Sequence, residues 1–196
     1  MTARPAAFID RDGTLIEERN YPITEADIVP LPNAGHALRR LSAAGYRCII
    51  LTNQSAVARG MLDEERLAEL HIHLAGALAA QGGEFDDLFY CPHHPDGVHV
   101  AYSFACTCRK PGRGLLDQAL AAHDIDLSRS VFIGDSPRDL FADAGPCHAR
   151  ILVRSGHALD DTSAADKVTP TIVEAVDWLV DGQAAQPEDS QNPQAS

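Results

Sequence analysis

The sequence lacks several features that would point to particular classes of protein. It has no apolar stretch approaching the ~20 residues that span a bilayer. It also has no block of Lys and Arg, and its formal net charge is −12, whereas nucleic acids and anionic membranes are bound largely through clustered cations. It contains no Gly-x-x-x-x-Gly-Lys-Ser/Thr loop, which argues against a P-loop kinase. We therefore expect a cytoplasmic protein with no nucleic-acid and no membrane partner.

The cysteines do not form the even set that a disulfide framework requires. There are 5 of them, at positions 48, 91, 106, 108 and 147. An odd and unevenly clustered set is more typical of a reducing compartment and of metal binding than of paired disulfides. Cys48 and Cys147 stand apart from the others, so we expect them to be packing residues or free thiols.

The chain alternates apolar runs with amphipathic segments. With 196 residues and 45% hydrophobic residues, it has the length and composition of one globular domain. Strands are predicted near residues 6–9, 47–51, 87–90, 130–133 and 150–153, with helices between them, one of which begins at Ser136. This order predicts an α/β fold with a mostly parallel sheet and helices on both faces. We expect a monomeric single domain over residues 1–181, followed by a disordered polar tail at 182–196.

Polar side chains follow the first, second and fourth predicted strands. Asp10 and Asp12 end the first strand, Thr52-Asn53-Gln54-Ser55 ends the second, and Asp135 ends the fourth. In open α/β sheets, ligands bind at the carboxyl ends of the strands. Two such close carboxylates call for a cation between them, and one can act as a nucleophile while the other transfers a proton. The hydroxyl and amide groups after the second strand could hold phosphoryl oxygens. On its own, the first stretch could also be a surface turn, where Asp and Gly are common.

Residues 91–110 have the composition of a metal-binding insertion. Two close pairs of ligands separated by a loop are typical of a tetrahedral zinc site. The best set is Cys91, His93, Cys106 and Cys108, with His94 and His99 as possible substitutes. Four protein ligands leave no open position, so this zinc would be structural. The alternative is a loop with loose thiols.

Two cations follow the last cysteine of this insertion directly. A loop held by zinc would present Arg109 and Lys110 at a fixed place, so that binding an anion would cost little ordering entropy. The alternative is that both are ordinary solvated cations. Asp139 lies three residues after Ser136 and is predicted to cap a helix start rather than to contact a metal.

Taken together, these motifs resemble those of the haloacid dehalogenase superfamily of phosphotransferases. The match lies in Asp10-x-Asp12-Gly13-Thr14, in Thr52, in Lys110 and in Gly134-Asp135-x-x-x-Asp139, in that order. The resemblance implies a Rossmann-like fold with a minimal cap and a magnesium-dependent phosphatase. It also implies that Mg²⁺ is held by Asp10, Asp135 and the backbone carbonyl of Asp12.

Within that superfamily, the cysteine-rich insertion is similar to the zinc-bearing branch. This branch contains phosphatases of heptose bisphosphate and of histidinol phosphate, and the long spacer between Cys91 and Cys106 looks more like the former. The heptose branch implies release of the 7-phosphate of D-glycero-D-manno-heptose 1,7-bisphosphate, through an aspartyl-phosphate, in the synthesis of ADP-heptose for the lipopolysaccharide core. One departure is Ser136, where some members carry a cation, although Arg138 follows two residues later.

The resemblance also implies roles for single residues. Asp10 would be the nucleophile and Asp12 the proton shuttle, while Thr52, Asn53, Arg109 and Lys110 would bind the substrate, with Arg109 at a second phosphate. The alternatives are a histidinol-phosphate phosphatase of histidine biosynthesis and, in another class, a non-catalytic phosphoacceptor or zinc interaction module. Asp12 argues against the last of these, because a stable phosphoacceptor gains nothing from a general base.

Overall fold

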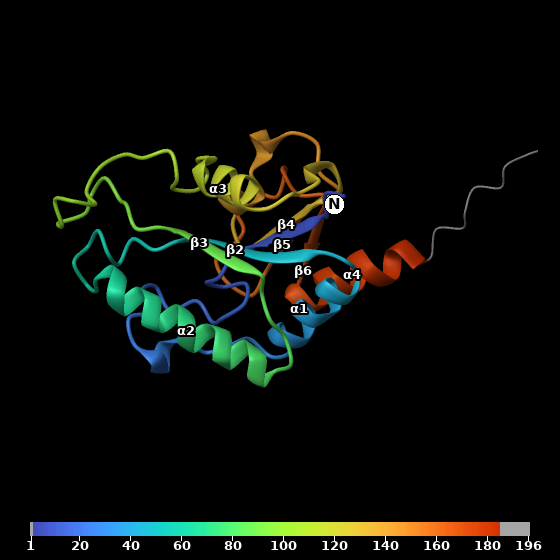
Figure 1. Ribbon diagram of the computed structural model, residues 1–196, viewed down its shortest axis with the longest axis horizontal. Helices are drawn as coiled ribbons and strands as arrows, with labels where there is room; N and C mark the ends of the chain where they lie inside the picture. The colour runs from blue at the N-terminus through green and yellow to red at the C-terminus, as the bar shows by residue number, and fades with distance from the viewer. Residues whose placement is uncertain (1, 185–196) are drawn as a thin grey trace, which may run out of the picture.

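A computed structural model describes residues 2–184, in which six parallel strands form one sheet (Figure 1). The strands are β1 (Ala6–Ile9), β2 (Arg47–Asn53), β3 (Asp87–Cys91), β4 (Val131–Gly134), β5 (Ala149–Val153) and β6 (Lys167–Thr169). Their order across the sheet is β3-β2-β1-β4-β5-β6, and every neighbouring pair is parallel. The chain therefore has the predicted α/β fold with a Rossmann-like strand order.

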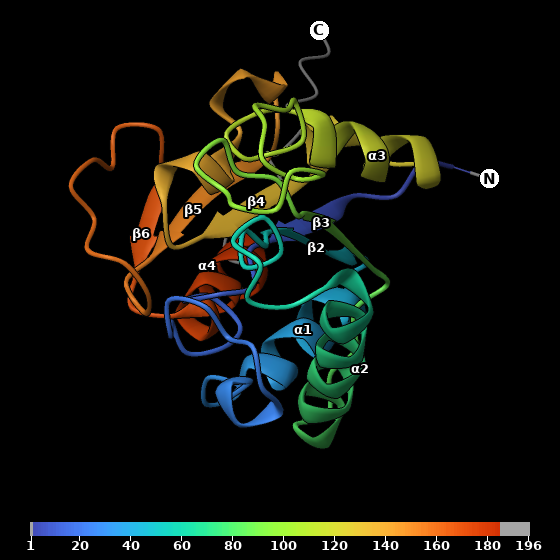
Figure 2. The ribbon, with the colours of Figure 1, turned by 90° about the vertical axis from the view of Figure 1, so that its left-hand side faces the viewer.

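Helices cover both faces of this sheet. They are α1 (Ala34–Ala43), α2 (Glu64–Ala80), α3 (Gly114–Ala122) and α4 (Ile172–Ala184), with 3₁₀ turns η1 (Glu25–Asp27), η2 (Leu127–Arg129), η3 (Pro137–Leu140) and η4 (Ala142–Ala144). The helices α1, α2 and α4 lie on one face, and α3 lies on the other (Figures 1 and 2). The sheet thus has a buried apolar layer on each side.

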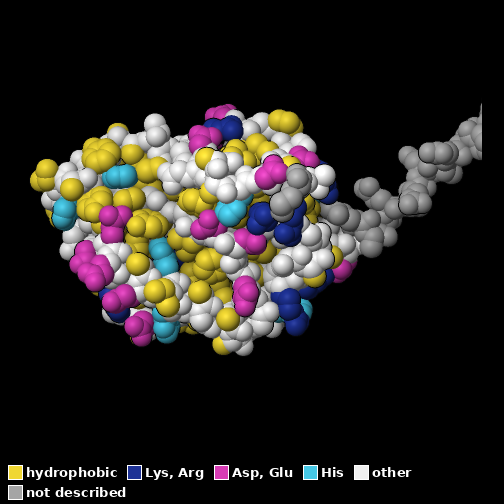
Figure 3. Space-filling view, in the orientation of Figure 1, with side chains coloured by type: hydrophobic (Ala, Val, Ile, Leu, Met, Phe, Trp, Pro, Cys, Tyr) yellow, Lys and Arg dark blue, Asp and Glu magenta, His cyan; other side chains and the backbone are white. Residues whose placement is uncertain are grey.

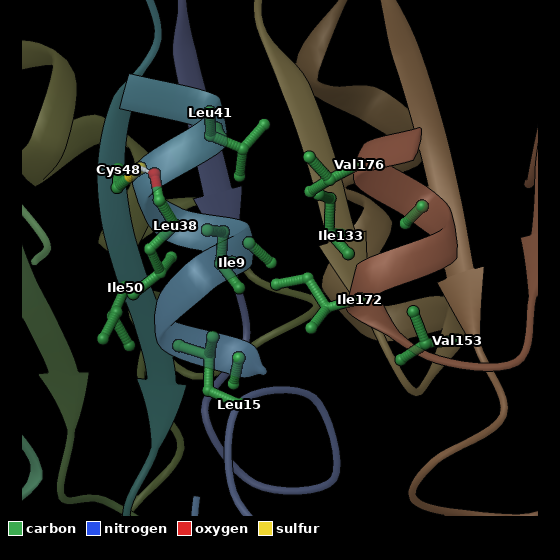
Figure 4. Close-up of a cluster of buried hydrophobic side chains, with 14 of the residues drawn as sticks. Ile9, Leu15, Leu38, Leu41, Cys48, Ile50, Ile133, Val153, Ile172 and Val176 are labelled. Carbon is green, nitrogen blue, oxygen red and sulfur yellow. Dashed lines mark hydrogen bonds between the residues drawn. The ribbon is translucent and has the colours of Figure 1, made fainter. Parts of the chain in front are cut away.

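The alternation of side chains along the strands divides the core into two clusters. In β1, Ala7 and Ile9 face α1 and α4, whereas Ala6 and Phe8 face α3. Figure 4 shows Ile9 and its neighbours from β2 and β4 packed against α1 and α4. Because both faces are covered, the central strands are apolar throughout, as parallel strands usually are.

Three features differ from the predicted elements. The short strand β6 was not predicted, because its three residues carry no clear periodicity. The segment that begins at Ser136 forms the 3₁₀ turn η3 instead of an α-helix, since Phe141 adopts a left-handed backbone (φ 44°) and ends the turn. The helix α4 extends to Ala184, so residues 182–184 belong to it. The remainder of the predicted tail lies outside the described residues.

The carboxyl ends of the strands form one edge of the sheet, which faces the viewer in Figure 2. From β1 the chain builds the sheet in one direction through β2 and β3, and then in the other through β4, β5 and β6. This change of direction places the crevice of the sheet between the ends of β1 and β4. Asp10 and Asp135 follow these two strands. The fold therefore brings together two carboxylates that are 125 residues apart in the numbering of the chain.

The lengths of the helices and the distribution of surface cations bear on the expected partners. Over residues 2–184, none of the helices is both long and apolar enough to cross a bilayer. On the face seen in Figure 3, Lys and Arg side chains occur in a few small groups. The monomeric state, the cytoplasmic location and the lack of a nucleic-acid partner stay predictions.

Candidate active site

A polar cavity of about 180 Å³ opens at the carboxyl edge of the sheet. All of the predicted catalytic and substrate-binding residues line it, together with Asp135 and further residues from the loops after β1, β2, β4 and β5. The lining residues are Asp10, Asp12, Glu18, Asn20, Tyr21, Thr52, Asn53, Ser55, Arg109, Lys110, Asp135, Arg138, Asp139 and His157. The predicted site is thus one physical cavity.

Lys110 is a buried residue that lines this cavity. Its Nζ atom is 2.6 Å from Oδ1 of Asp10 and 2.7 Å from Oδ1 of Asp139. It also donates a hydrogen bond of 2.6 Å to the backbone carbonyl of Leu51 in β2. Three oxygen acceptors therefore fix the ammonium group against the predicted nucleophile.

The ionisation of this pair is set by burial and by neighbouring charges. Burial raises the pKa of Asp10 well above its usual range, opposed by Lys110 and reinforced by Asp139 and Asp135. Burial lowers the pKa of Lys110, but the charges of Asp10 and Asp139 raise it by more. The pKa of Lys110 is therefore raised. Lys110 thus stays charged, whereas Asp10 needs cations around it to stay an anion.

Asp135 is held by a loop after β5 that the sequence did not suggest. Its Oδ2 atom accepts hydrogen bonds from the backbone N–H of His157 (2.8 Å) and from the Nδ1 of that ring (2.7 Å). A Cβ on Gly13 would lie 2.3 Å from the same oxygen, and a Cβ on Gly156 would lie 2.0 Å from it. Ser155 Oγ ties the two glycine loops together through the carbonyl of Gly13 (2.7 Å). Only glycine at both positions leaves room for this carboxylate.

The acidic residues at this edge fit a divalent cation. Carboxylate oxygens of Asp10, Asp135 and Asp139 lie within 4.8 Å of one another, and all three residues are buried. Hard oxygen ligands of this kind suit Mg²⁺, and three buried carboxylates beside a single lysine leave excess negative charge for a cation to neutralise. Glu18 and His157 lie beside Asp135 within the same distance limit.

The turn after Asp135 supplies two further polar groups. Asp139 caps η3 as predicted, since its Oδ2 accepts the N–H of Ser136 at 3.0 Å. Its other oxygen binds Lys110, a contact that the sequence did not suggest. Arg138 lines the cavity. Arg138, two residues after Ser136, therefore places a cation at the cavity.

The four predicted zinc ligands come together at one point beside the cavity. The sulfur atoms of Cys91, Cys106 and Cys108 lie 3.1–3.5 Å apart. Nδ1 of His93 is 3.2 Å from the sulfur of Cys108 and 3.6 Å from the sulfur of Cys91. Around zinc with Zn–S of about 2.3 Å, tetrahedral sulfur neighbours lie about 3.8 Å apart, whereas a disulfide needs about 2.05 Å. The donor set and its convergence thus fit one tetrahedral zinc ion. His94 and His99 are outside this group.

The zinc cluster is connected directly to the two cations that follow it. The backbone N–H of Arg109 donates to Sγ of Cys106 (3.4 Å), and its Nη1 reaches the carbonyl of His93 (3.4 Å). The backbone of Lys110 is paired with Asn53 through both amide atoms of that side chain (3.0 and 3.2 Å). Asn53, predicted to bind substrate, lines the cavity while fixing the end of the zinc loop to β2.

The polar loop after the first strand was expected to line the site, although several of its lining residues could not be singled out from the sequence. Glu18, Asn20 and Tyr21 come from the polar loop after β1, and His157 follows β5. The strand-end rule that identified Asp10 and Asp135 could have pointed to His157. No local signal distinguishes Glu18 from its neighbour Glu17.

We expect Lys110→Met to lower the free energy of unfolding by about 3–5 kcal/mol, because it leaves buried carboxylates of Asp10 and Asp139 without their partner. Urea denaturation without added magnesium measures this change. Lys167→Met is the matched control, since Lys167 is exposed on β6. A loss below about 1 kcal/mol would show that the buried pairs do not hold Lys110 as described.

Comparisons with known proteins give a consistent set of relatives. Residues 107–180 match the HAD-hydrolase-like family. The D-glycero-beta-D-manno-heptose-1,7-bisphosphate 7-phosphatase of Rhodopseudomonas palustris is 43% identical over 139 residues, which cover 71% of this chain and 77% of that protein.

Solved structures agree with this similarity. The D,D-heptose 1,7-bisphosphate phosphatase of B. bronchiseptica, complexed with magnesium and phosphate, superposes with a TM-score of 0.77 at 30% identity, covering 91% of this chain and 99% of that one. A putative HAD-like phosphatase from Mesorhizobium loti gives a TM-score of 0.80 at 28% identity, covering 97% and 91%. With this fold, cavity and zinc cluster, the chain belongs to the family of D-glycero-D-manno-heptose-1,7-bisphosphate 7-phosphatases among the HAD-like hydrolases.

Proposed function

We propose that this protein is a phosphatase that removes the 7-phosphate of D-glycero-D-manno-heptose 1,7-bisphosphate. The observation that carries the proposal is the convergence of Asp10, Asp12 and Lys110 in one cavity. Relatives that cover most of the chain carry this activity in their names. The arrangement supplies a nucleophile, a proton shuttle and a cation, which are the groups that hydrolysis through a covalent intermediate requires.

The reaction proceeds in two steps. The carboxylate of Asp10 attacks phosphorus, the bond to the sugar oxygen breaks, and Asp12 gives that oxygen a proton. Asp12 then removes a proton from a water molecule, which attacks the aspartyl-phosphate and releases inorganic phosphate and Asp10. Lys110 and the hydroxyl of Thr52 offset the charge on the phosphoryl oxygens.

The acidic edge of the cavity is the place for the metal of this reaction. Asp10, Asp135 and the backbone carbonyl of Asp12 would hold Mg²⁺, which neutralises charge on the transferred phosphoryl group. His157 and the two glycines keep the carboxylate of Asp135 in place for this purpose.

A second phosphate fits the cationic side of the cavity. The pKa of Arg109 is lowered by burial, and the charges of Arg138 and Arg59 lower it further. Both Arg109 and Arg138 line the cavity. Neighbouring guanidinium groups that destabilise one another are stabilised by an anion between them, so we assign the non-reacting phosphate of the substrate to Arg109.

Arg109→Ala is expected to cost about 1.5–3 kcal/mol of transition-state stabilisation with heptose 1,7-bisphosphate, or about 10- to 150-fold in kcat/KM, and much less with a monophosphate. The backbone contact of Arg109 with Cys106 survives this change. Arg113→Ala is the control, because Arg113 pairs with Asp117 on α3 and does not line the cavity. Equal losses on both substrates would place Arg109 at the reacting phosphate.

A phosphate-release panel with magnesium tests the proposed function. It compares heptose 1,7-bisphosphate, histidinol phosphate and simple hexose phosphates. We expect the heptose bisphosphate to give the highest kcat/KM. A preference for histidinol phosphate would overturn the assigned substrate and leave the phosphatase chemistry, whereas phosphorylation without turnover would indicate a phosphoacceptor.

A further inference from the structure

Two buried polar residues lie behind the proton shuttle of the proposed site. The side chain of Arg11 is fully buried, although arginine is rarely found inside a protein without a partner. Its Nε and Nη2 atoms lie 2.9–3.2 Å from the carboxylate oxygens of Asp12. Nη2 also donates to Oε1 of Gln54 at 2.9 Å.

Gln54 connects this guanidinium to two residues of the cavity. Its Nε2 donates to Oδ2 of Asp12 at 3.0 Å and to Oγ1 of Thr52 at 2.7 Å. The orientation of the amide is settled by chemistry, because a guanidinium only donates and the carbonyl oxygen must therefore face Arg11. Both amide hydrogens and the carbonyl of Gln54 are thus in use.

Burying this network costs the folded state free energy. Removing the guanidinium of Arg11 from water costs several kcal/mol, and apolar residues of similar volume often stabilise a core better. Even with these contacts, Nη1 of Arg11 has no hydrogen-bond partner among the described residues. Such local conflicts with good packing are expected mainly where function requires them.

The contacts leave a defined set of atoms free to act. Arg11 and Gln54 donate hydrogen bonds to the carboxylate of Asp12, which also lines the cavity. Because Thr52 accepts a hydrogen bond from Gln54, its own hydroxyl proton remains available for an acceptor in the cavity.

We propose that Arg11 and Gln54 are positioning residues that hold the Asp12 carboxylate in the orientation needed to protonate the leaving oxygen, and the Thr52 hydroxyl in its donor orientation. The proposal rests on the proposed phosphatase function. It predicts an effect that depends on the leaving group. A sugar oxygen leaves as a strongly basic alkoxide and needs the proton of Asp12, whereas p-nitrophenolate leaves without one.

The test measures kcat/KM for Gln54→Leu on a sugar phosphate and on p-nitrophenyl phosphate. This constant covers the steps up to the release of the first product, so hydrolysis of the aspartyl-phosphate does not enter it. General acid catalysis is worth about 10²–10⁴-fold, and a misplaced acid should forfeit part of that. We expect the loss on the sugar phosphate to exceed the loss on p-nitrophenyl phosphate by about tenfold or more.

Two further variants separate the parts of the network. Thr52→Val removes the hydroxyl and one acceptor of Gln54 but leaves the contacts of Arg11 and Gln54 with Asp12, so its loss should be the same on both substrates. Arg11→Lys keeps the charge but loses the forked contact with Asp12, and it should show the same leaving-group dependence as Gln54→Leu. If Arg11→Lys does not fold, Gln54→Leu still decides the matter.

Equal losses on the two substrates for Gln54→Leu, or no loss on either, would overturn the positioning role. A wild-type protein that hydrolyses neither substrate would instead overturn the proposed function. The two failures are therefore distinguishable in the same experiment.

Discussion

Asp10→Asn is expected to lower kcat to the background of the assay, a loss on the order of 10⁶-fold, as removal of a nucleophile can cost an enzyme. The amide keeps the size of the side chain and can still accept from Lys110, so the fold should survive. The measurement is steady-state phosphate release with a variant purified free of host phosphatases. Asp143→Asn, at an exposed position on η4, is the control.

Asp12→Asn should lower kcat by a smaller factor, about 10²–10⁴-fold, because it removes the proton shuttle and leaves the nucleophile in place. In kcat/KM, which excludes hydrolysis of the aspartyl-phosphate, its loss should also be smaller on p-nitrophenyl phosphate than on a sugar phosphate. Substantial activity of Asp10→Asn would contradict a covalent mechanism through this carboxylate.

The second large effect concerns the zinc cluster. Cys106→Ser and Cys108→Ser should each reduce zinc from about one ion per chain to nearly none, since apparent zinc binding of about 10–16 kcal/mol in zinc-finger peptides depends on the complete ligand set. Elemental analysis measures the metal. Cys147→Ser, outside the cluster, should keep its zinc.

Loss of zinc should weaken substrate binding more than it weakens the core. Arg109 takes its backbone position from Cys106, whereas the strands of the sheet pack mainly through the two apolar clusters. KM should therefore rise while the sheet remains folded. A fully active protein without zinc, from a preparation never exposed to chelator, would contradict the structural role of the cluster.

The parts of the site that the sequence predicts share a physical cause. Asp10 and Asp135 each follow a buried parallel strand, and Thr52 lies in the last residues of another. Parallel strands end at one edge, so their proximity follows from the order of the strands. The zinc set could be predicted because close pairs of ligands leave few ways to satisfy a tetrahedral ion.

The remaining parts depend on contacts that no local pattern encodes. Arg11 follows β1, and an arginine at such a position is expected to be exposed. It is instead fully buried, because Asp12 and Gln54 pair with it. The contact between Lys110 and Asp139 joins two loops. His157 depends on the path of the loop after β5, which apolar periodicity does not determine.

The most direct test of the central claim follows the two phosphates of heptose 1,7-bisphosphate by ³¹P NMR during turnover with magnesium. The proposed mechanism predicts that the signal of the 7-phosphate disappears, that inorganic phosphate grows in equal amount, and that the anomeric phosphate persists. Loss of the anomeric phosphate, or an unchanged spectrum from an active preparation that hydrolyses histidinol phosphate, would contradict it.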